Sequence, residues 1–142
     1  MIAVDTNILV YSHREDSPFH TSAWDSLSNL AGRPGSWAIP WPCIHEFLSV
    51  VTHPRIYQPP TALDQALETV GAWLESPNLV LLREGPDYFN HLGQLLVGGK
   101  IAGPKVHDAR IAALCLSHGV RELWSTDRDF SRFPGLNVRN PL

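Results

Sequence analysis

Short apolar runs alternate with longer segments of helical periodicity along the whole chain. Strands are expected where four apolar runs occur, at residues 2–5, 37–41, 78–82 and 120–125, and at "NVR" over residues 137–139. Between these runs the most regular helical spacing is i, i+4, i+7 and i+11, at Leu63, Leu67, Val70 and Leu74. This alternation predicts an α/β fold, with a central, mostly parallel sheet of four to five strands and helices on both faces.

Turn and capping residues indicate where the helices begin and end. Ser17 followed by Pro18 predicts an N-cap and the first position of a helix. Gly119 supplies a stop for the last long helix. Further helices are expected over residues 42–52, from residue 85 onward, and over residues 105–118.

Composition limits the class of protein. The chain has 142 residues, of which 44% are hydrophobic and 18% charged, values typical of a globular protein. The length fits one domain over residues 1–142. No apolar run approaches the ~20 residues of a membrane span, and the first residues form a strand pattern instead of a signal peptide. Cys43 and Cys115 fall on apolar helical faces, so we expect reduced core thiols in a cytoplasmic protein.

Two carboxylates follow predicted strands in the same way. Asp5 ends the apolar run at the start of the chain, and Asp127 follows the strand in "ELWSTDRDF", with Asp129 two residues later. Because the carboxyl ends of parallel strands meet at one edge of a sheet, where ligands gather, Asp5 and Asp127 are expected to lie close together. Taken singly, each acid could instead be a helix cap or a turn residue.

Two further acids lie on apolar helical stripes. Glu46 shares its stripe with Cys43 and Val50. Asp108 stands at the head of a stripe that continues with Ile111. A charge on a core-facing stripe is costly unless it is paired or coordinated; the alternative is an exposed acid in the first turn of a helix, where the helix dipole favours it. Four acids in such positions favour one shared site over separate caps: Asp5, Glu46, Asp108 and Asp127.

A group of carboxylates without a nearby lysine requires a cation. Oxygen ligands without Cys or His are the donor set that Mg²⁺ or Mn²⁺ prefers. Mg²⁺ usually binds one or two carboxylates directly and keeps several waters, so the other acids would hold those waters or a second ion. Such ions activate water and stabilise charge on a phosphoryl group. The pattern therefore predicts a Mg²⁺ site, in which Mn²⁺ substitutes.

Longer segments around these acids carry a resemblance that runs nearly end to end. They are "VDTNILVY", the acid in "HEF", "KVHDARIAAL", and "WSTDRDF" with the closing "FPGLNVRNPL". The sequence resembles the PIN-domain ribonucleases, and more narrowly the VapC-like toxins of bacterial toxin–antitoxin pairs. The resemblance implies a metal-dependent endoribonuclease that hydrolyses RNA phosphodiester bonds, with the four acids as catalytic and metal-binding residues. It also implies supporting roles for Thr6, Asn7, Thr126 and Asp129.

The same resemblance implies three kinds of partner: an RNA substrate such as tRNA or rRNA, a cognate VapB-like antitoxin that blocks the enzyme, and a second copy in a homodimer. The distribution of charge fits an RNA substrate. Residues 1–99 carry four Lys and Arg against ten Asp and Glu, whereas residues 100–142 carry seven against four, a net charge of +3. An ordinary solvated surface is the alternative. The candidates for RNA contact are Lys100, Lys105 and Arg110.

Other hydrolase classes lack a required residue. A zinc site of the HExxH type needs a second His where Ser49 stands. A phosphatase with an aspartyl nucleophile needs a second Asp where Asn7 stands. The remaining alternative is a catalytically silent PIN-fold module that binds RNA or protein. Loss of a site acid would be its sign, and a metal titration distinguishes the two.

Histidines and tryptophans near these motifs have mainly structural interpretations. His45 and His107 each precede a site acid, and neighbouring helical residues point about 100° apart, so both are expected to face outward. Tryptophans can stack on RNA bases. We expect Trp24, Trp37 and Trp73 instead in the core or in a dimer contact.

Overall fold

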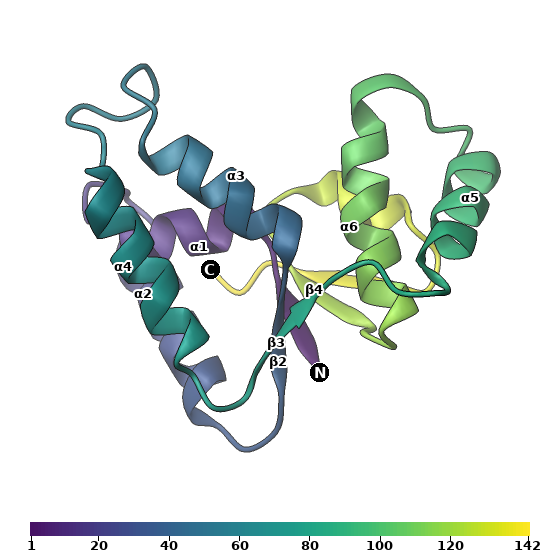
Figure 1. Cartoon of the computed structure of the whole chain (residues 1–142), viewed down its shortest axis with the longest axis horizontal. Coiled ribbons are helices and arrows are strands. Elements are labelled where there is room, and N and C mark those ends of the chain that lie inside the picture. The colour runs from purple at the N-terminus through teal and green to yellow at the C-terminus, as the bar shows by residue number, and fades with distance from the viewer.

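The computed structural model describes all 142 residues and places five short strands in one sheet (Figure 1). The strands are β1 (Ile2–Val4), β2 (Trp37–Pro40), β3 (Leu79–Leu82), β4 (Glu122–Trp124) and β5 (Asn137–Arg139). They are arranged in the order β3-β2-β1-β4-β5, and every neighbouring pair is parallel. The predicted α/β class with a parallel sheet is confirmed, and the N-terminal strand lies at the centre of that sheet.

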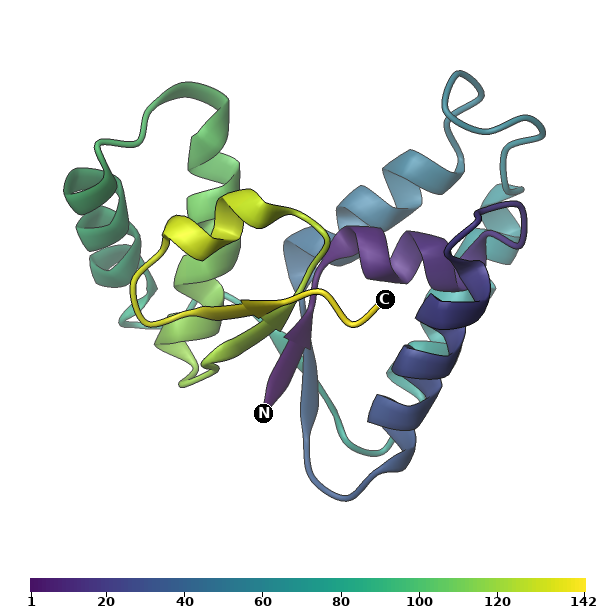
Figure 2. The ribbon, with the colours of Figure 1, turned by 180° about the vertical axis from the view of Figure 1, so that it is seen from behind.

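Six helices and two short 3₁₀ turns surround the sheet. They are α1 (Thr6–His13), α2 (His20–Gly32), α3 (Trp41–Val51), α4 (Leu63–Leu74), α5 (Tyr88–Gly99), η1 (Gly103–Lys105), α6 (Val106–Ser117) and η2 (Arg128–Arg132). Helices α1 to α4 form one arm of the molecule and α5 with α6 the other (Figures 1 and 2). The strands run between the arms, and their carboxyl ends point toward the notch between α3 and α6. None of the helices combines the length and the apolar character needed to cross a membrane.

The core consists of the strands and the inner helix faces. Trp37, Ile39 and Leu123 are almost completely buried, because strands of a parallel sheet are covered on both faces. Cys43 and Cys115 are buried free thiols, as predicted. The prediction that Trp37 lies in the core is therefore confirmed.

The regular leucine stripe of α4 does not face the core. Leu63, Leu67 and Leu74 are 62%, 51% and 45% exposed, whereas Ala66 and Val70 are buried. Helix α4 packs mainly on α3, and only Ala66 and Val70 of α4 are buried. Trp24 on α2 is also outside the core, at 57% exposure. Helices α2 and α4 thus present large apolar side chains on the surface of their arm.

Some predicted element ends are shifted and others are confirmed. Helix α2 begins at His20 instead of Pro18, and the Ser17 hydroxyl accepts a hydrogen bond from the Phe19 N–H at 3.1 Å within the preceding turn. Gly119 adopts a φ of +74° directly after His118, the C-cap of α6, as its predicted stop requires. Strand β1 ends at Val4, one residue earlier than predicted, so Asp5 occupies the N-cap position of α1.

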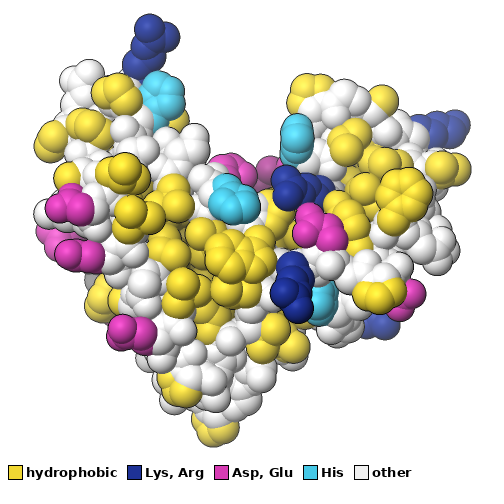
Figure 3. All heavy atoms as spheres, viewed as in Figure 1, with side chains coloured by type: hydrophobic (Ala, Val, Ile, Leu, Met, Phe, Trp, Pro, Cys, Tyr) yellow, Lys and Arg dark blue, Asp and Glu magenta, His cyan; other side chains and the backbone are white.

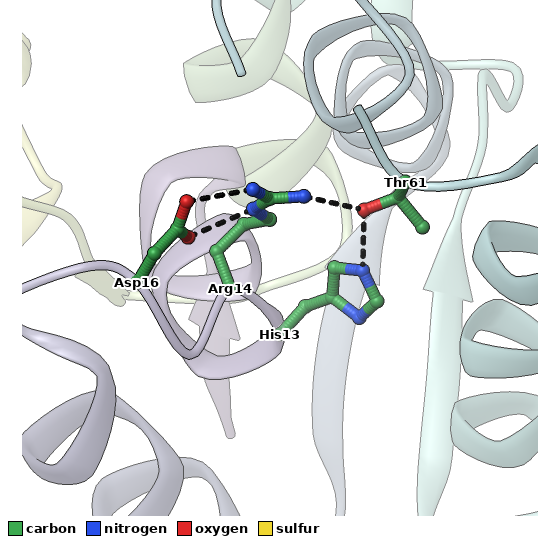
Figure 4. Close-up of polar contacts among 4 residues, drawn as sticks. All are labelled: His13, Arg14, Asp16 and Thr61. Atoms are coloured by element: carbon green, nitrogen blue, oxygen red, sulfur yellow. Dashed lines mark hydrogen bonds and ion pairs between the residues drawn. The ribbon is translucent and has the colours of Figure 1, made fainter. Parts of the chain in front are cut away.

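The loop between α3 and α4 is fastened to the end of α1 (Figure 4). Thr61 Oγ1 lies 3.0 Å from His13 Nε2 and accepts a 3.2 Å hydrogen bond from Arg14 Nη1. Arg14 also pairs with Asp16 at 2.6 Å, and its guanidinium carbon lies 4.3 Å from the centroid of the Tyr57 ring. These contacts fix the position of Tyr57, which lines the acidic cavity described next.

Candidate active site

The four predicted site acids line one cavity of about 220 Å³. Each comes from a different part of the fold: Asp5 follows β1, Glu46 lies on α3, Asp108 lies on α6, and Asp127 follows β4. Acidic side chains lie at the base of the notch between the two arms, with histidine and basic side chains beside it (Figure 3). The fold therefore brings the four carboxylates together at the carboxyl edge of the sheet.

Asp5 is the most deeply buried of the four, at 5% exposure. Although it stands at the N-cap of α1, its side chain makes no capping hydrogen bond. Instead, Oδ2 accepts a 2.7 Å hydrogen bond from the Ser125 hydroxyl, and Oδ1 accepts a 3.6 Å hydrogen bond from the Cys43 thiol. Burial raises the pKa of Asp5 to about 6, although the Ser125 hydrogen bond acts in the opposite direction. A cation beside this carboxylate would relieve the cost of its buried charge.

Asp127 combines a structural role with a place in the cavity. Its backbone N–H donates a 2.9 Å hydrogen bond to Ser125 Oγ. Its Oδ1 accepts a 2.9 Å hydrogen bond from the Asp129 N–H and so caps η2. The alternative interpretation of Asp127 as a cap is thus also correct, but the cap uses one carboxylate oxygen and leaves Oδ2 available to a ligand.

Asp108 stands in the first turn of α6 and is partly buried. Burial is the main cause that raises its pKa, and the nearby charge of Asp127 acts in the same direction. Oxygens of Asp108, Asp127 and Asp129 all lie within 4.8 Å of one another. This set of hard oxygen donors fits a divalent ion such as Mg²⁺ or Mn²⁺.

Two of the three basic residues predicted to contact RNA, Lys105 and Arg110, form ion pairs within the protein. Lys105 Nζ lies 2.7 Å from Asp129 Oδ2, and this hydrogen bond is the main cause that lowers the pKa of Asp129. The premise that no lysine lies near the carboxylates is therefore wrong. Arg110 pairs with Glu84 at 3.5 Å. Lys100 is exposed at the C-cap of α5 and forms no ion pair.

Glu46 is exposed, so the prediction that it faces the core is wrong, but it still lines the cavity. It lies in the middle of α3, so an interpretation as a first-turn acid is wrong for this residue. Its charge also contributes, as a minor cause after burial, to the raised pKa of Asp5. His45 and His107 are exposed, as predicted.

Two of the residues expected to support the site, Asn7 and Thr126, connect the segments that follow β1 and β4. Asn7 Oδ1 accepts a 3.3 Å hydrogen bond from the Thr126 N–H, which ties the start of α1 to the segment after β4. Thr126 thus contributes through its backbone. The Thr6 hydroxyl is buried in the cavity wall and has no hydrogen-bond partner within the protein. An unpartnered polar atom at this point fits a cavity that receives water or a hydrated ion.

Residues 2–136 match the family model described as the PIN domain. The chain belongs to the PIN-domain family. Two curated members with similar sequences are from Mycobacterium tuberculosis. This PIN-domain protein is 34% identical to "Ribonuclease VapC43" over 142 residues, which cover 100% of this chain and 96% of that one. It is 31% identical to "Ribonuclease VapC48" over 138 residues, which cover 97% of this chain and 95% of that one.

Solved structures agree on the fold. VapBC2 from Rickettsia felis, bound to a DNA fragment of its promoter, superposes with a TM-score of 0.71 at 21% identity, over 99% of this chain and 98% of that one. VapC20 of Mycobacterium tuberculosis, described as a sarcin-ricin loop cleaving toxin, gives a TM-score of 0.69 at 16% identity, over 96% and 98%. The resemblance drawn from the sequence motifs, to VapC ribonucleases with a PIN domain, is confirmed.

Proposed function

We propose that this PIN-domain protein is a Mg²⁺-dependent endoribonuclease and the toxin of a toxin–antitoxin pair. The observation that carries the proposal is the single cavity of about 220 Å³ that four carboxylates from four separate elements line. Its full-length similarity to VapC ribonucleases supports RNA as the substrate class. The RNA is then a structured one such as tRNA or rRNA, as in the homologue that cleaves the sarcin-ricin loop.

We assign the metal ion mainly to Asp108 and Asp127, whose oxygens lie close together with one from Asp129. Asp5 and Glu46 would hold waters of the ion from the other walls of the cavity. When bound, Mg²⁺ or Mn²⁺ would supply charge neutralisation at the scissile phosphate and a more acidic water.

The protein's own groups orient the reactants. The Ser125 hydroxyl holds Asp5 Oδ2 in place, so Oδ1, which also accepts the weak Cys43 thiol hydrogen bond, can use its second lone pair to accept a hydrogen bond from an attacking water. The unpartnered Thr6 hydroxyl provides a second polar group for that water. Asn7 fixes the distance between the segments that carry Asp5 and Asp127 through its hydrogen bond to Thr126.

We further propose two protein partners. A cognate antitoxin would cover the apolar side chains that α2 and α4 expose, including Trp24 and Leu67. A cavity of about 240 Å³ between α1, α2 and α4, lined by Trp24 and Trp73, offers it a place to dock. A second copy would cover the exposed Phe89 and Val97 of α5 in a homodimer. The two buried free thiols support a cytoplasmic location.

A metal titration with matched variants tests the enzymatic part. Purified protein is incubated with end-labelled tRNA and rRNA in EDTA, Mg²⁺ or Mn²⁺. We expect cleavage only with a divalent ion, and losses of orders of magnitude in Asp5→Asn, Glu46→Gln, Asp108→Asn and Asp127→Asn. A smaller loss is expected in Asp129→Asn. Full activity in EDTA would refute the metal mechanism, and RNA binding without cleavage in either metal would identify a silent binding module.

A further inference from the structure

A second cavity lies outside the acidic site. It measures about 490 Å³ and is enclosed by α5, the end of α6, and the segment that follows η2. Figure 2 shows these segments around one region of the arm formed by α5 and α6. Two of its lining residues are arginines, Arg121 and Arg132, and we call it the arginine pocket. Its volume is in the range of small-molecule sites, about 300–1,000 Å³.

No acid within the lining of the arginine pocket neutralises its charge. No Asp or Glu lines it. Neither Arg121 nor Arg132 forms an ion pair, in contrast to Lys105 and Arg110 near the acidic site. Two unpaired guanidinium groups in a concave site favour an anionic ligand, and their planar donor arrays match phosphate oxygens.

The backbone keeps the pocket open around these groups. Gly135 has a φ of +83°, a backbone conformation that favours glycine, and the turn it forms lies beside Arg121 Nη1. Gly98 and Gly99 line the pocket without side chains that could fill it. His91 and Gln94 add hydrogen-bonding groups of the kind that contact sugars and base edges.

A single short turn connects the pocket to the acidic site. Asp127 caps the start of η2, and Arg132 is its last residue, a length of about 10 Å at the rise of a 3₁₀ helix. The pKa of Asp129 is lowered chiefly by the Lys105 hydrogen bond, and Arg132 acts in the same direction. Arg132 is thus within electrostatic reach of the site carboxylates.

We propose that the arginine pocket binds a phosphate-bearing nucleotide of the RNA strand beside the one that is cleaved. This rests on the proposed function and extends it, because it names where the strand runs after leaving the acidic cavity. A nucleic-acid strand carries phosphates at regular intervals, so it can occupy both sites at once. Arg121 and Arg132 contact the phosphate, while Gln94 and His91 contact the nucleoside.

Binding measurements in EDTA test the pocket separately from cleavage. The probe is a short fluorescein-labelled single-stranded RNA of mixed sequence, followed by fluorescence anisotropy with the full chain. Arg121→Met and Arg132→Met keep the apolar stems of two exposed side chains. Each is expected to raise Kd about tenfold, as for a lost charge-assisted hydrogen bond. Each should also reduce the slope of log K against log salt by about 0.7.

Arg139→Met is the matched control. Arg139 is exposed on β5, forms no ion pair and does not line the pocket, so its loss is expected to leave Kd unchanged. Thermal melts verify that all three variants fold. A polyglutamate peptide serves as a second probe for the same proteins.

Three results would overturn the proposal that the arginine pocket binds RNA. They are equal RNA affinity of the pocket variants and the control, no RNA binding by the wild type, and pocket-dependent binding of polyglutamate in place of RNA. Cleavage in Mg²⁺ is measured in parallel. Equal affinity together with wild-type cleavage would reject the pocket and retain the nuclease. Pocket-dependent binding without cleavage in Mg²⁺ or Mn²⁺ would reject the nuclease and retain the pocket.

Discussion

The Ser125 hydroxyl donates a 2.7 Å hydrogen bond to Asp5 Oδ2 and accepts a 2.9 Å hydrogen bond from the Asp127 N–H. One small side chain thus connects two site acids that follow adjacent parallel strands, β1 and β4. Ser125 is itself buried, at 2% exposure. The relative position of Asp5 and Asp127 therefore depends on this hydroxyl.

Replacing Ser125 with Ala is expected to lower both stability and activity. The buried Asp5 carboxylate loses a hydrogen bond, which costs about 2 kcal/mol of unfolding free energy. Misplacement of Asp5 should reduce cleavage roughly 10- to 100-fold, and the pKa of Asp5 should rise further. Urea unfolding and the pH profile of cleavage measure these effects. Ser131→Ala is the control, because that hydroxyl donates to the Arg128 carbonyl on the surface of η2; equal losses in both variants would contradict the role of Ser125.

The metal-free protein should become more stable, through Asp5, as the pH falls from 7 toward 4. Burial raises the pKa of Asp5 from 3.8 to about 6, so its stabilising contribution is complete below the unfolded value and is lost as the pH rises through 6. The difference corresponds to about 3 kcal/mol. Asp5→Asn is expected to remove this dependence. Urea unfolding in EDTA between pH 4 and 8 measures both proteins.

The comparison with Asp5→Asn is needed because other groups titrate in the same range. Burial lowers the pKa of His13, so His13 destabilises the fold as the pH falls below its ordinary value of 6.5. That contribution is common to wild type and variant and cancels in their difference. Parallel stability curves for the two proteins would show that Asp5 is not the titrating group.

Replacing Asp108 with Asn should stabilise the metal-free protein at pH 7 and reduce the stabilisation that Mn²⁺ provides. The substitution removes a carboxylate whose pKa is raised by burial and by Asp127, and a ligand bound only by the native state stabilises it in proportion to its affinity. Thermal melts with EDTA and with Mn²⁺ measure both changes. Asp64→Asn is the matched control, since Asp64 also stands in the first turn of a helix but outside the cavity. Should Asp108→Asn behave like Asp64→Asn, Asp108 is a helix-terminal acid only.

Replacing Thr61 with Val should loosen the loop between α3 and α4. The change leaves the partly buried His13 Nε2 and Arg14 Nη1 without their shared partner, at a cost of about 1 kcal/mol for each lost hydrogen bond. Hydrogen exchange of residues 52–62 should accelerate, and cleavage should weaken because Tyr57 lines the cavity. Thr52→Val is the control, since its hydroxyl bonds within α3. Unchanged exchange in Thr61→Val would show that other contacts hold the loop.

The sequence was sufficient to predict the parallel sheet and the meeting of the four acids in one cavity. Asp5 and Asp127 follow strands that a parallel sheet aligns, so their proximity follows from topology alone. Helical spacing was less informative for α4, because periodicity identifies an apolar stripe but not the neighbour that covers it. Leu67 and Val70 belong to the same stripe, and only Val70 is buried.

Contacts between distant segments could not be predicted in the same way. Lys105 meets Asp129 across 24 positions, and neither residue lies on a strand or an apolar stripe. Arg121 precedes β4 and Arg132 ends η2, so no periodicity of one helix or strand relates the two arginines. Their convergence depends on the path of the chain around α6, which is a property of the complete fold.

The order of the strands has a consequence during synthesis on the ribosome. β1 is synthesised well before its neighbour β4 and the acid Asp127. The acidic cavity therefore cannot close on a nascent chain that stops short of Asp127. Domains fold as units once their residues have emerged, so a cell is exposed to an assembled active site only after β4 and Asp127 have left the ribosome.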